Sequence, residues 1–305
     1  MNGILNVNKP EGPTSFSIVS KIKKLTGEKR VGHAGTLDPA ASGVLPICVG
    51  HGTRVIEYLM ENTKNYRAEI EFGKTTDTYD ATGSLTSIED SSYLSRRQIE
   101  TTLQNFIGEI QQVPPVYSAL KWKGKPYYKL ARAGIDIKIA ARPVVIHTIT
   151  ILDWQFPVVT IDVTCGKGTY IRSLAHDLGQ MIGCGAYMKS LERRAYGPFS
   201  ITNAISIDEL EESFAGKYWQ RYIHPIDSVL LHLKAIVVND DVRQDIRHGR
   251  TVDNKYINTQ MLTDESKPEE SQEVLCRAYG LDGNFLGILR FVSETGQWKP
   301  EKVFI

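Results

Sequence analysis

The sequence predicts an α+β fold with a mainly antiparallel mixed sheet flanked by helices, followed by a smaller β-rich module. Several short segments alternate apolar and polar residues, as half-buried strands do. Other segments place their apolar residues on one helical face. Strand and helix patterns do not alternate regularly, as they do in the βαβ units of a parallel sheet. The strand patterns are 3–8, 66–73 and 158–165, and the helical patterns are 14–27, 95–108 and 169–183.

The three helical patterns carry start and stop signals. In the first, Thr14 or Ser15 can cap the start, and Gly27 suits the end. The second begins with a Ser-x-x-Gln capping box at Ser95 and ends at Gly108. The third follows directly on a strand pattern, so we expect the chain to turn sharply from strand to helix before residue 169.

The pattern of predicted secondary structure changes near residue 230. A short helical pattern ends at Gly249, the acidic stretch 263–273 is typical of an exposed loop, and strand patterns flank the turn residues 282–284. No low-complexity linker precedes this part and no repeat is evident. We therefore expect two domains, 1–230 and 231–305, which agrees with a prior of roughly 150 residues a domain.

Composition excludes several classes of protein. With 41% hydrophobic and 23% charged residues in 305, the chain can build an ordinary core. No apolar run approaches the roughly 20 residues that span a bilayer, and no signal peptide is evident, so we expect a cytoplasmic protein. Its four cysteines form no metal-binding or disulfide pattern and are interpreted as buried, reduced thiols.

Positive charge is concentrated in one segment. The net charge is +1, but residues 1–200 carry +6, residues 201–305 carry −5, and 121–142 alone carry +6. In the overlapping stretch 116–138, four aromatic residues (Tyr117, Trp122, Tyr127 and Tyr128) interleave with lysines. Rings can stack on bases while cations neutralise phosphates, which favours an inserted nucleic-acid-binding loop over a solvated helix. Its candidate binding residues are Lys121, Lys123, Lys125, Lys129 and Arg132.

The stretch GHAGTLDPAASGVLP, residues 32–46, places one carboxylate, Asp38, in a loop rich in glycine and proline. It matches neither of the common phosphate-binding glycine patterns. Taken alone, such a loop is more often a structural turn than a catalytic one, and an Asp before Pro is a common turn former. We expect Val44 and Leu45 to pack against the core without a role in chemistry.

Three further motifs each give only a weak indication of function when taken alone. Lys9 lies between two loop-forming stretches, just before a predicted helix. Tyr66 lies at the start of a predicted strand, where an aromatic residue usually has a packing role. Asp77 and Asp80 are typical of turns or caps. Arg172 lies in the first turn of the third helix, where a cation is unfavourable with the helix dipole. That misfit predicts a carboxylate partner, the alternative being a surface arginine without a partner.

Together, NKPEGPTS, GHAGTLDPAASGVLP, YRAEIEFGKTTDTYDATG and CGKGTYIRSLAHDLG resemble the TruB family, the standalone tRNA pseudouridine-55 synthases of bacteria. The resemblance runs through residues 1–200 in motif order. It implies the pseudouridine synthase fold, and residues 231–305 are similar to the small β-barrel PUA module that such enzymes append. It also implies that one uridine in the T-arm loop of tRNA is isomerised to pseudouridine, without cofactor or metal.

The resemblance assigns roles to residues that match the family's motifs. It makes Asp38 the catalytic carboxylate, Arg172 its ion-pair partner and Tyr66 a residue that stacks on the base and transfers protons. As an anion at pH 7, Asp38 could attack a sugar carbon or remove a sugar proton, and the sequence leaves both open. The other matching positions are His33, which would fill the space of the flipped uridine, Tyr170 and Leu191 in the uracil pocket, Lys9 at the loop or a phosphate, and the RNA-clamping loop 117–140.

Two other interpretations stay open. Guide-RNA-dependent pseudouridine synthases of archaea and eukaryotes share these motifs, although the basic segment favours an enzyme that grips tRNA itself. A non-catalytic tRNA-binding or chaperone protein is the second alternative, against which the set Asp38, Tyr66 and Arg172 argues. We expect a monomer that binds the T arm of tRNA and needs no protein partner or membrane.

Overall fold

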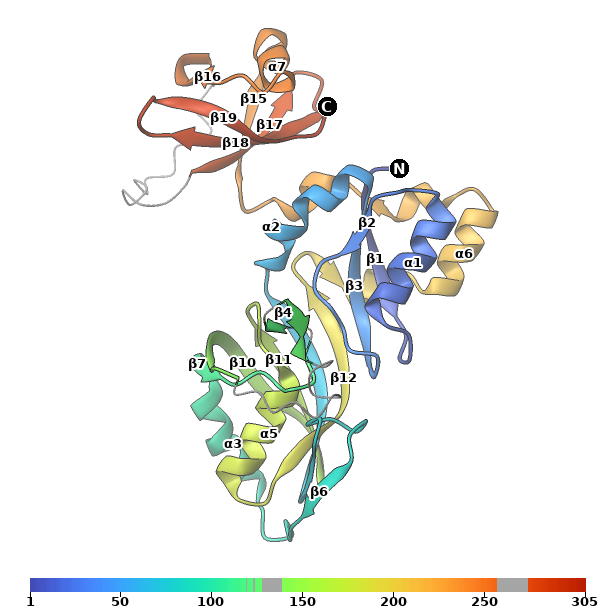
Figure 1. Cartoon of the computed structure of the whole chain (residues 1–305), viewed down its shortest axis with the longest axis vertical. Coiled ribbons are helices and arrows are strands. Elements are labelled where there is room, and N and C mark those ends of the chain that lie inside the picture. Colours follow the sequence, from blue (N-terminus) through green and yellow to red (C-terminus); the bar gives the residue numbers. More distant parts are fainter. Residues whose placement is uncertain (119, 123, 128–138, 257–273) are drawn as a thin grey trace.

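The computed structural model describes residues 1–118, 120–122, 124–127, 139–256 and 274–305. It contains a large sheet with helices and, beyond it, a smaller sheet with its own helix (Figure 1). In the large sheet the strand order is β14-β1-β3-β12-β4-β11-β10-β7, with β2 and β13 paired beside β3 and β12. Its strands are β1 (Gly3–Lys9), β2 (Val31–His33), β3 (Ala41–Val49), β4 (Lys64–Phe72), β7 (Gly108–Gln112), β10 (Arg142–Gln155), β11 (Val158–Cys165), β12 (Ala186–Tyr196), β13 (Phe199–Ser200) and β14 (Ile223–His224).

The predicted antiparallel character of this sheet is confirmed. Among its described strands, β3 and β12 run parallel and the other neighbours are antiparallel. The β3–β12 contact is short, with three register pairs from Leu191↔Ala41 to Arg193↔Gly43. This junction joins two halves of the sheet, and the loop that precedes β3 lies beside β12 there.

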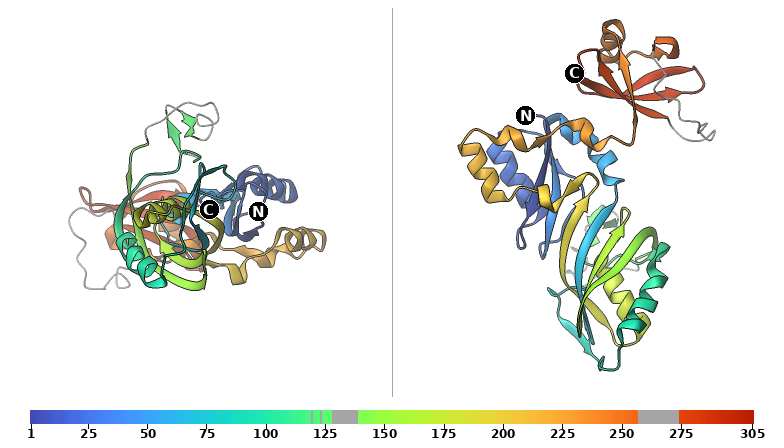
Figure 2. Two further views of the ribbon diagram at one scale, coloured as in Figure 1. Left: turned by 90° about the horizontal axis from the view of Figure 1, so that it is seen from below. Right: turned by 180° about the vertical axis from the view of Figure 1, so that it is seen from behind.

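Helices from distant parts of the chain share one apolar core with the sheet. Side chains of α1, α3, α5 and α6 pack with those of β1, β4 and β11 in a single cluster. Figure 2 shows these helices against the two halves of the sheet. The helices are α1 (Ser15–Thr26), α2 (Ile56–Met60), α3 (Arg96–Leu103), α5 (Ile171–Ile182), α6 (Ile207–Ala215) and α7 (Asp240–Arg247).

The helix signals in the sequence are largely confirmed. Thr14 caps α1, and Gly27 ends it with φ 67°, which suits glycine. Ser95 and Gln98 form the predicted capping box of α3. The predicted end of that helix at Gly108 is wrong, because α3 stops at Leu103, a 3-10 turn follows, and the chain then enters β7.

The C-terminal part is a curled five-stranded sheet of order β15-β17-β18-β19-β16, with α7 packed beside it. Ile288 belongs to the same apolar cluster as Val55 and Val229, which joins this sheet to the first part. The ion pair Lys302–Glu57 and a hydrogen bond from Arg54 to the Val303 carbonyl also join the two parts. The domain boundary at residue 230 stays a prediction. The strands are β15 (Lys234–Val238), β16 (Val252–Asp253), β17 (Leu275–Gly280), β18 (Phe285–Val292) and β19 (Gln297–Val303).

Two small hairpins extend from the large sheet, and their strands are β5 (Lys74–Thr76), β6 (Leu85–Ile88), β8 (Lys121–Trp122) and β9 (Lys125–Pro126). The second hairpin lies in the basic segment, of which Lys123, Lys129 and Arg132 fall outside the described residues, as does the acidic stretch 263–273. All four cysteines are buried and free, as predicted. No helix in the described ranges is long and apolar enough to cross a membrane.

Candidate active site

A cavity of about 360 Å³ lies at the junction of the two sheet halves. It brings together Asp38, Tyr66, Tyr170, Arg172 and Leu191, which come from four separate stretches of the sequence. Its lining is completed by Gly35, Thr36, Leu37, Met60, Lys64, Ser118, Leu120, Gly166, Lys167, Gly168, Thr169, Ile171, Arg193 and Tyr196.

Asp38 lies in the loop between β2 and β3, and hydrogen bonds from both sides hold its backbone. The Ala41 amide donates to the Asp38 carbonyl at 3.0 Å, closing a turn through the following proline. The Ser15 hydroxyl donates to the Leu37 carbonyl and accepts from the Leu37 amide, both at 2.9 Å. These bonds fix the direction in which the carboxylate leaves the loop.

Lys9 supports the same loop from beneath. Its fully buried ammonium donates to the carbonyls of Ala41 at 2.6 Å, Pro10 at 2.8 Å and Pro39 at 3.3 Å. Burial lowers the pKa of Lys9 to about 8, and the nearby Asp38 carboxylate opposes this decrease. Of the two functions that the sequence left open for Lys9, the geometry matches support of the loop, since Lys9 does not line the cavity.

Arg193 on β12 is a second buried cation at this wall, and sequence reasoning missed it. Its guanidinium donates to the carbonyls of Val44 at 2.7 Å and Gly35 at 3.2 Å, which ties the loop to β12. Gly43 permits the close approach, because a Cβ there would meet the Arg193 carbonyl oxygen at 2.3 Å and the φ of 103° is itself glycine-like.

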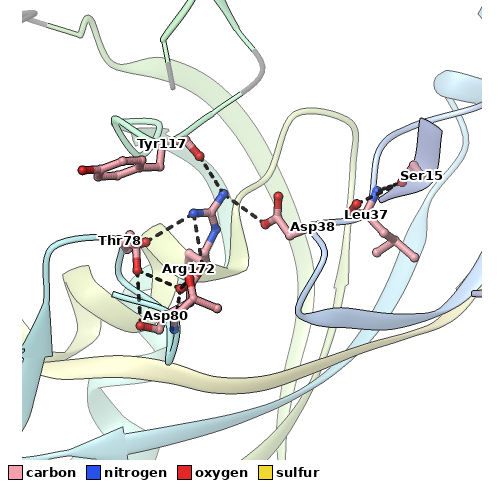
Figure 3. A network of polar contacts seen from close by, with 8 residues as sticks. Ser15, Leu37, Asp38, Thr78, Asp80, Tyr117 and Arg172 are labelled. Atoms are coloured by element: carbon pink, nitrogen blue, oxygen red, sulfur yellow. Dashed lines mark hydrogen bonds and ion pairs between the residues drawn. The ribbon is translucent and has the colours of Figure 1, made fainter. Parts of the chain in front are cut away.

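On the opposite wall, the first turn of α5 presents Arg172 to Asp38. Arg172 Nη2 lies 3.0 Å from Asp38 Oδ2, and Nη1 lies 3.3 Å from Asp80 Oδ2 (Figure 3). The guanidinium also donates to the carbonyls of Tyr117 at 3.1 Å and Thr78 at 3.3 Å. The misfit with the helix dipole is thus resolved by carboxylate partners, as the sequence predicted.

Three charged groups act on the Asp38 carboxyl. Burial in the cavity raises the pKa of Asp38, Arg172 opposes that rise, Asp80 adds to it and Lys9 opposes it. The side chain nevertheless keeps 39% of its surface accessible, on the side of the cavity. Asp38 is therefore a carboxylate that a ligand can reach, held by one guanidinium.

Asp80, interpreted from the sequence as a turn residue, is also a partner of Arg172. Its Oδ1 accepts from the Thr78 hydroxyl at 2.7 Å, the Thr82 hydroxyl at 2.6 Å and the Thr82 amide at 3.0 Å. These bonds leave Oδ2 facing Arg172. Asp80 is 5% exposed, and burial is the property that a turn signal does not reveal.

Tyr66 on β4 and Leu191 on β12 lie on neighbouring strands, and both line the cavity. Tyr66 is the register partner of Arg193, and Leu191 pairs with Ala68 on β4. Burial raises the pKa of Tyr66, and the adjacent Arg193 opposes that rise. A neutral phenol and an aliphatic side chain thus lie near each other on one face of the sheet, and both line the cavity.

Tyr170 is fixed through its backbone by Gln112, another residue that sequence reasoning missed. The Gln112 amide group accepts from the Tyr170 amide at 2.8 Å and donates to its carbonyl at 3.0 Å. Gln112 is 1% exposed and comes from the edge strand β7. Burial raises the pKa of the Tyr170 phenol, so this ring too is neutral at the cavity wall.

Not every predicted residue lies at the cavity. His33 is half-buried on β2, pairs with Ile47 and does not line it. Burial lowers the pKa of His33, and no described group bonds its Nδ1. Val44 and Leu45 are fully buried, as expected. Lys121 belongs to β8 and Lys125 to β9. The described residues contain no cluster of His, Cys, Asp or Glu able to hold a metal ion.

Known proteins with similar sequences point to one family. Residues 23–171 match the family model described as TruB family pseudouridylate synthase (N terminal domain), and 172–231 match tRNA pseudouridylate synthase B C-terminal domain. A Dehalococcoides mccartyi protein named tRNA pseudouridine synthase B is 41% identical over all of this chain and 97% of its own length. The Clostridium kluyveri protein of that name is also 41% identical, over the full length of both.

Among solved structures, a chain from a Cbf5-Nop10-Gar1 complex superposes with a TM-score of 0.74 at 26% identity, over 99% of this chain and 85% of the other. A chain from an H/ACA RNP bound to a substrate RNA gives the same TM-score at 25% identity, over 99% and 85%. These matches agree with the α+β architecture and the C-terminal sheet. On its full-length identity to curated relatives, the chain belongs to the TruB family of pseudouridylate synthases.

Proposed function

We propose that this chain isomerises the uridine at position 55, in the T-arm loop of tRNA, to pseudouridine, acting in the cytoplasm as a monomer without cofactor. The observation that carries the proposal is Asp38, an accessible carboxylate held by Arg172 in a cavity of about 360 Å³. Relatives that are 41% identical, and of which this chain covers 97% or more, bear the name tRNA pseudouridine synthase B.

The cavity favours a base that has left its stack. The glycosidic bond of a base that is stacked on its neighbours is inaccessible to an enzyme. The nucleotide must therefore be flipped out of the stack and into the active site. Tyr66 offers an aromatic face and Leu191 an aliphatic one at the cavity wall, which suits a uracil ring. The base would then lie with its sugar beside Asp38.

Asp38 supplies the chemistry of the isomerisation. The bond between C1′ of the sugar and N1 of uracil breaks, the base turns, and a bond between C1′ and C5 forms, with the proton of C5 leaving and N1 becoming protonated. The carboxylate either attacks the sugar or removes a sugar proton when the first bond breaks. In this proposal Arg172 keeps that carboxylate ionised and oriented, and Tyr66 transfers a proton.

The direct test uses the purified chain and a T-arm stem-loop transcript without any other RNA. We expect pseudouridine at position 55 and none when that position is cytidine. Transfer RNA from cells that lack the protein should have unmodified uridine there. Pseudouridine elsewhere in the transcript would contradict the proposal. So would pseudouridine that is still present at position 55 in the cells that lack the protein.

A guide-RNA-dependent synthase is the second candidate, favoured by the likeness to chains from the Cbf5-Nop10-Gar1 complex and the H/ACA RNP. The basic segment 121–142, with its charge of +6, supports a chain that binds tRNA itself. The same assay separates the two, because the second candidate would form no pseudouridine until a guide RNA is added.

A further inference from the structure

Tyr79 has a backbone conformation that bulky residues avoid. Its φ is 62°, and in the described part of the chain Lys217 is the other non-glycine residue with positive φ. The left-handed conformation costs a bulky side chain about 1 kcal/mol or more, so its presence beside a site suggests a role. Lys217 is exposed near the end of α6, away from the cavity lining, whereas Thr78, the residue before Tyr79, accepts a hydrogen bond from Arg172.

The strained residue is held by its side chain and its backbone. The Tyr79 ring stacks on the His176 ring of α5 with centroids 3.8 Å apart and planes 12° from parallel. The Met188 amide on β12 donates to the Tyr79 carbonyl at 3.0 Å. The tyrosine is therefore gripped between one helix and one strand.

Both neighbours of Tyr79 bind the guanidinium that holds Asp38. The Thr78 carbonyl and the Asp80 carboxylate each lie 3.3 Å from Arg172 Nη1 (Figure 3). The left-handed turn at Tyr79 allows these two groups to face the same atom. His176 lies four residues after Arg172 in α5, so both side chains lie on one helix face.

We propose that the stacked pair Tyr79–His176 is a positioning clamp: it holds the turn 78–80 against α5 and so fixes the Arg172 guanidinium toward Asp38. Neither ring lines the cavity, so both residues act through Arg172. The inference deepens the function proposed above and rests on it.

The His176 ring contributes its flat surface. Its Nδ1 is buried and none of the described groups bonds it, and burial lowers the pKa of the imidazole. A neutral ring held by stacking should be replaceable by another ring. We therefore expect Tyr79→Phe and His176→Phe to retain activity within about twofold, since stacking and shape survive.

The test compares Tyr79→Gly with Lys217→Gly. Glycine relieves the strain at both positions, but only at position 79 does it remove the stack. Because a misplaced catalytic group can cost up to about a hundredfold, we expect kcat on the T-arm stem-loop to fall roughly tenfold in Tyr79→Gly. Its tRNA Kd and Tm should stay near those of the unmodified chain, and Lys217→Gly should keep full kcat.

A second variant tests the clamp from the helix side. His176→Ala should lower kcat as much as Tyr79→Gly does, and the double variant should fall no further than either single one. Additive losses, full kcat in Tyr79→Gly, or failure of Tyr79→Phe to retain activity would each overturn the clamp. An inactive unmodified chain would instead overturn the proposed function.

The pH dependence adds a readout that a purely structural role would not move. Asp38 faces Arg172, Asp80 and Lys9, and Arg172 opposes the rise of its pKa. If the clamp is lost and Arg172 drifts away, the pKa of Asp38 rises further. The acidic limb of the kcat profile should then move to higher pH in Tyr79→Gly and stay in place in Tyr79→Phe, and an unmoved limb in Tyr79→Gly would contradict the clamp.

Discussion

The two walls of the cavity use buried cations in different ways. On the wall of the Asp38 loop, Lys9 and Arg193 donate to backbone carbonyls. On the wall of α5, Arg172 binds two carboxylates as well as two carbonyls. The first wall therefore fixes the shape of a loop, and the second fixes the ionisation and direction of Asp38. Loss of a cation from the first wall should show mainly in stability, and loss from the second mainly in rate.

Apart from the loss of Asp38 itself, the largest effect is expected for Arg172→Met. It removes the guanidinium that binds both Asp38 and Asp80, and removal of such an electrostatic partner costs roughly a hundred- to a thousandfold in kcat. Arg172 is 6% exposed, so tRNA binding should change little. Single-turnover pseudouridine formation and a binding titration measure both quantities.

Arg67→Met is the matched control for Arg172→Met. Arg67 also pairs with an aspartate, Asp162, at 2.9 Å, but its side chain is 41% exposed and outside the cavity lining. It should keep its activity. If kcat fell equally in both variants, the position of Arg172 in the cavity would not explain its effect on the rate.

On the first wall, we expect Lys9→Met to lower the free energy of unfolding by about 3 kcal/mol. Three carbonyls lose their donor, and each unsatisfied buried group costs about 1–3 kcal/mol, of which relaxation recovers a part. Urea denaturation measures the change. Lys21→Met, which removes an exposed ion pair with Glu211, should change the stability by less than about 1 kcal/mol. A stable but inactive Lys9→Met would contradict the division between the walls.

A smaller effect is expected for Asp80→Asn. It weakens the hold on Arg172, so kcat should fall roughly tenfold. It also removes a negative charge that raises the pKa of Asp38, so the acidic limb of the kcat profile should move to lower pH. Asp77→Asn, an exposed carboxylate three residues away, should leave the limb in place. A limb that moves to higher pH in Asp80→Asn would show that the loosening of Arg172 outweighs the lost charge.

The smallest effect per residue is expected in the basic segment, where each lysine acts on one phosphate. Joint replacement of Lys121, Lys123, Lys125 and Lys129 by Gln should weaken tRNA binding and reduce the slope of log K against log salt by up to about 3. The rate at saturating tRNA should not change. An unchanged slope would place the RNA-binding surface elsewhere.

How much of the site the sequence predicts depends on the signal each residue leaves. The carboxylate partner of Arg172 could be predicted, because a cation in the first turn of a helix is locally unfavourable. Arg193 could not, because two adjacent arginines in a strand pattern do not reveal which one faces the core, and a bulge in β12 shifts the alternation there. Asp80 looked like a turn residue and is one, but only the fold brings that turn to α5.

The fold shows the same limit. Local signals such as the cap at Ser95 and the alternation over 158–165 appear in the structure where the sequence indicates them. The parallel junction of β3 with β12, which opens the cavity, joins residues about 150 positions apart and leaves no local pattern. The end of α3 was missed for a similar reason, because a 3-10 turn and the pairing of β7 decide it.

The measurement that bears most directly on the account is pseudouridine formation by Asp38→Asn. The substitution keeps the size of the side chain and removes its charge. We expect no pseudouridine in the T-arm stem-loop above background, with tRNA binding retained within a fewfold and Tm unchanged. Activity that persists in this variant would contradict the central claim that the Asp38 carboxylate, held by Arg172, carries the chemistry.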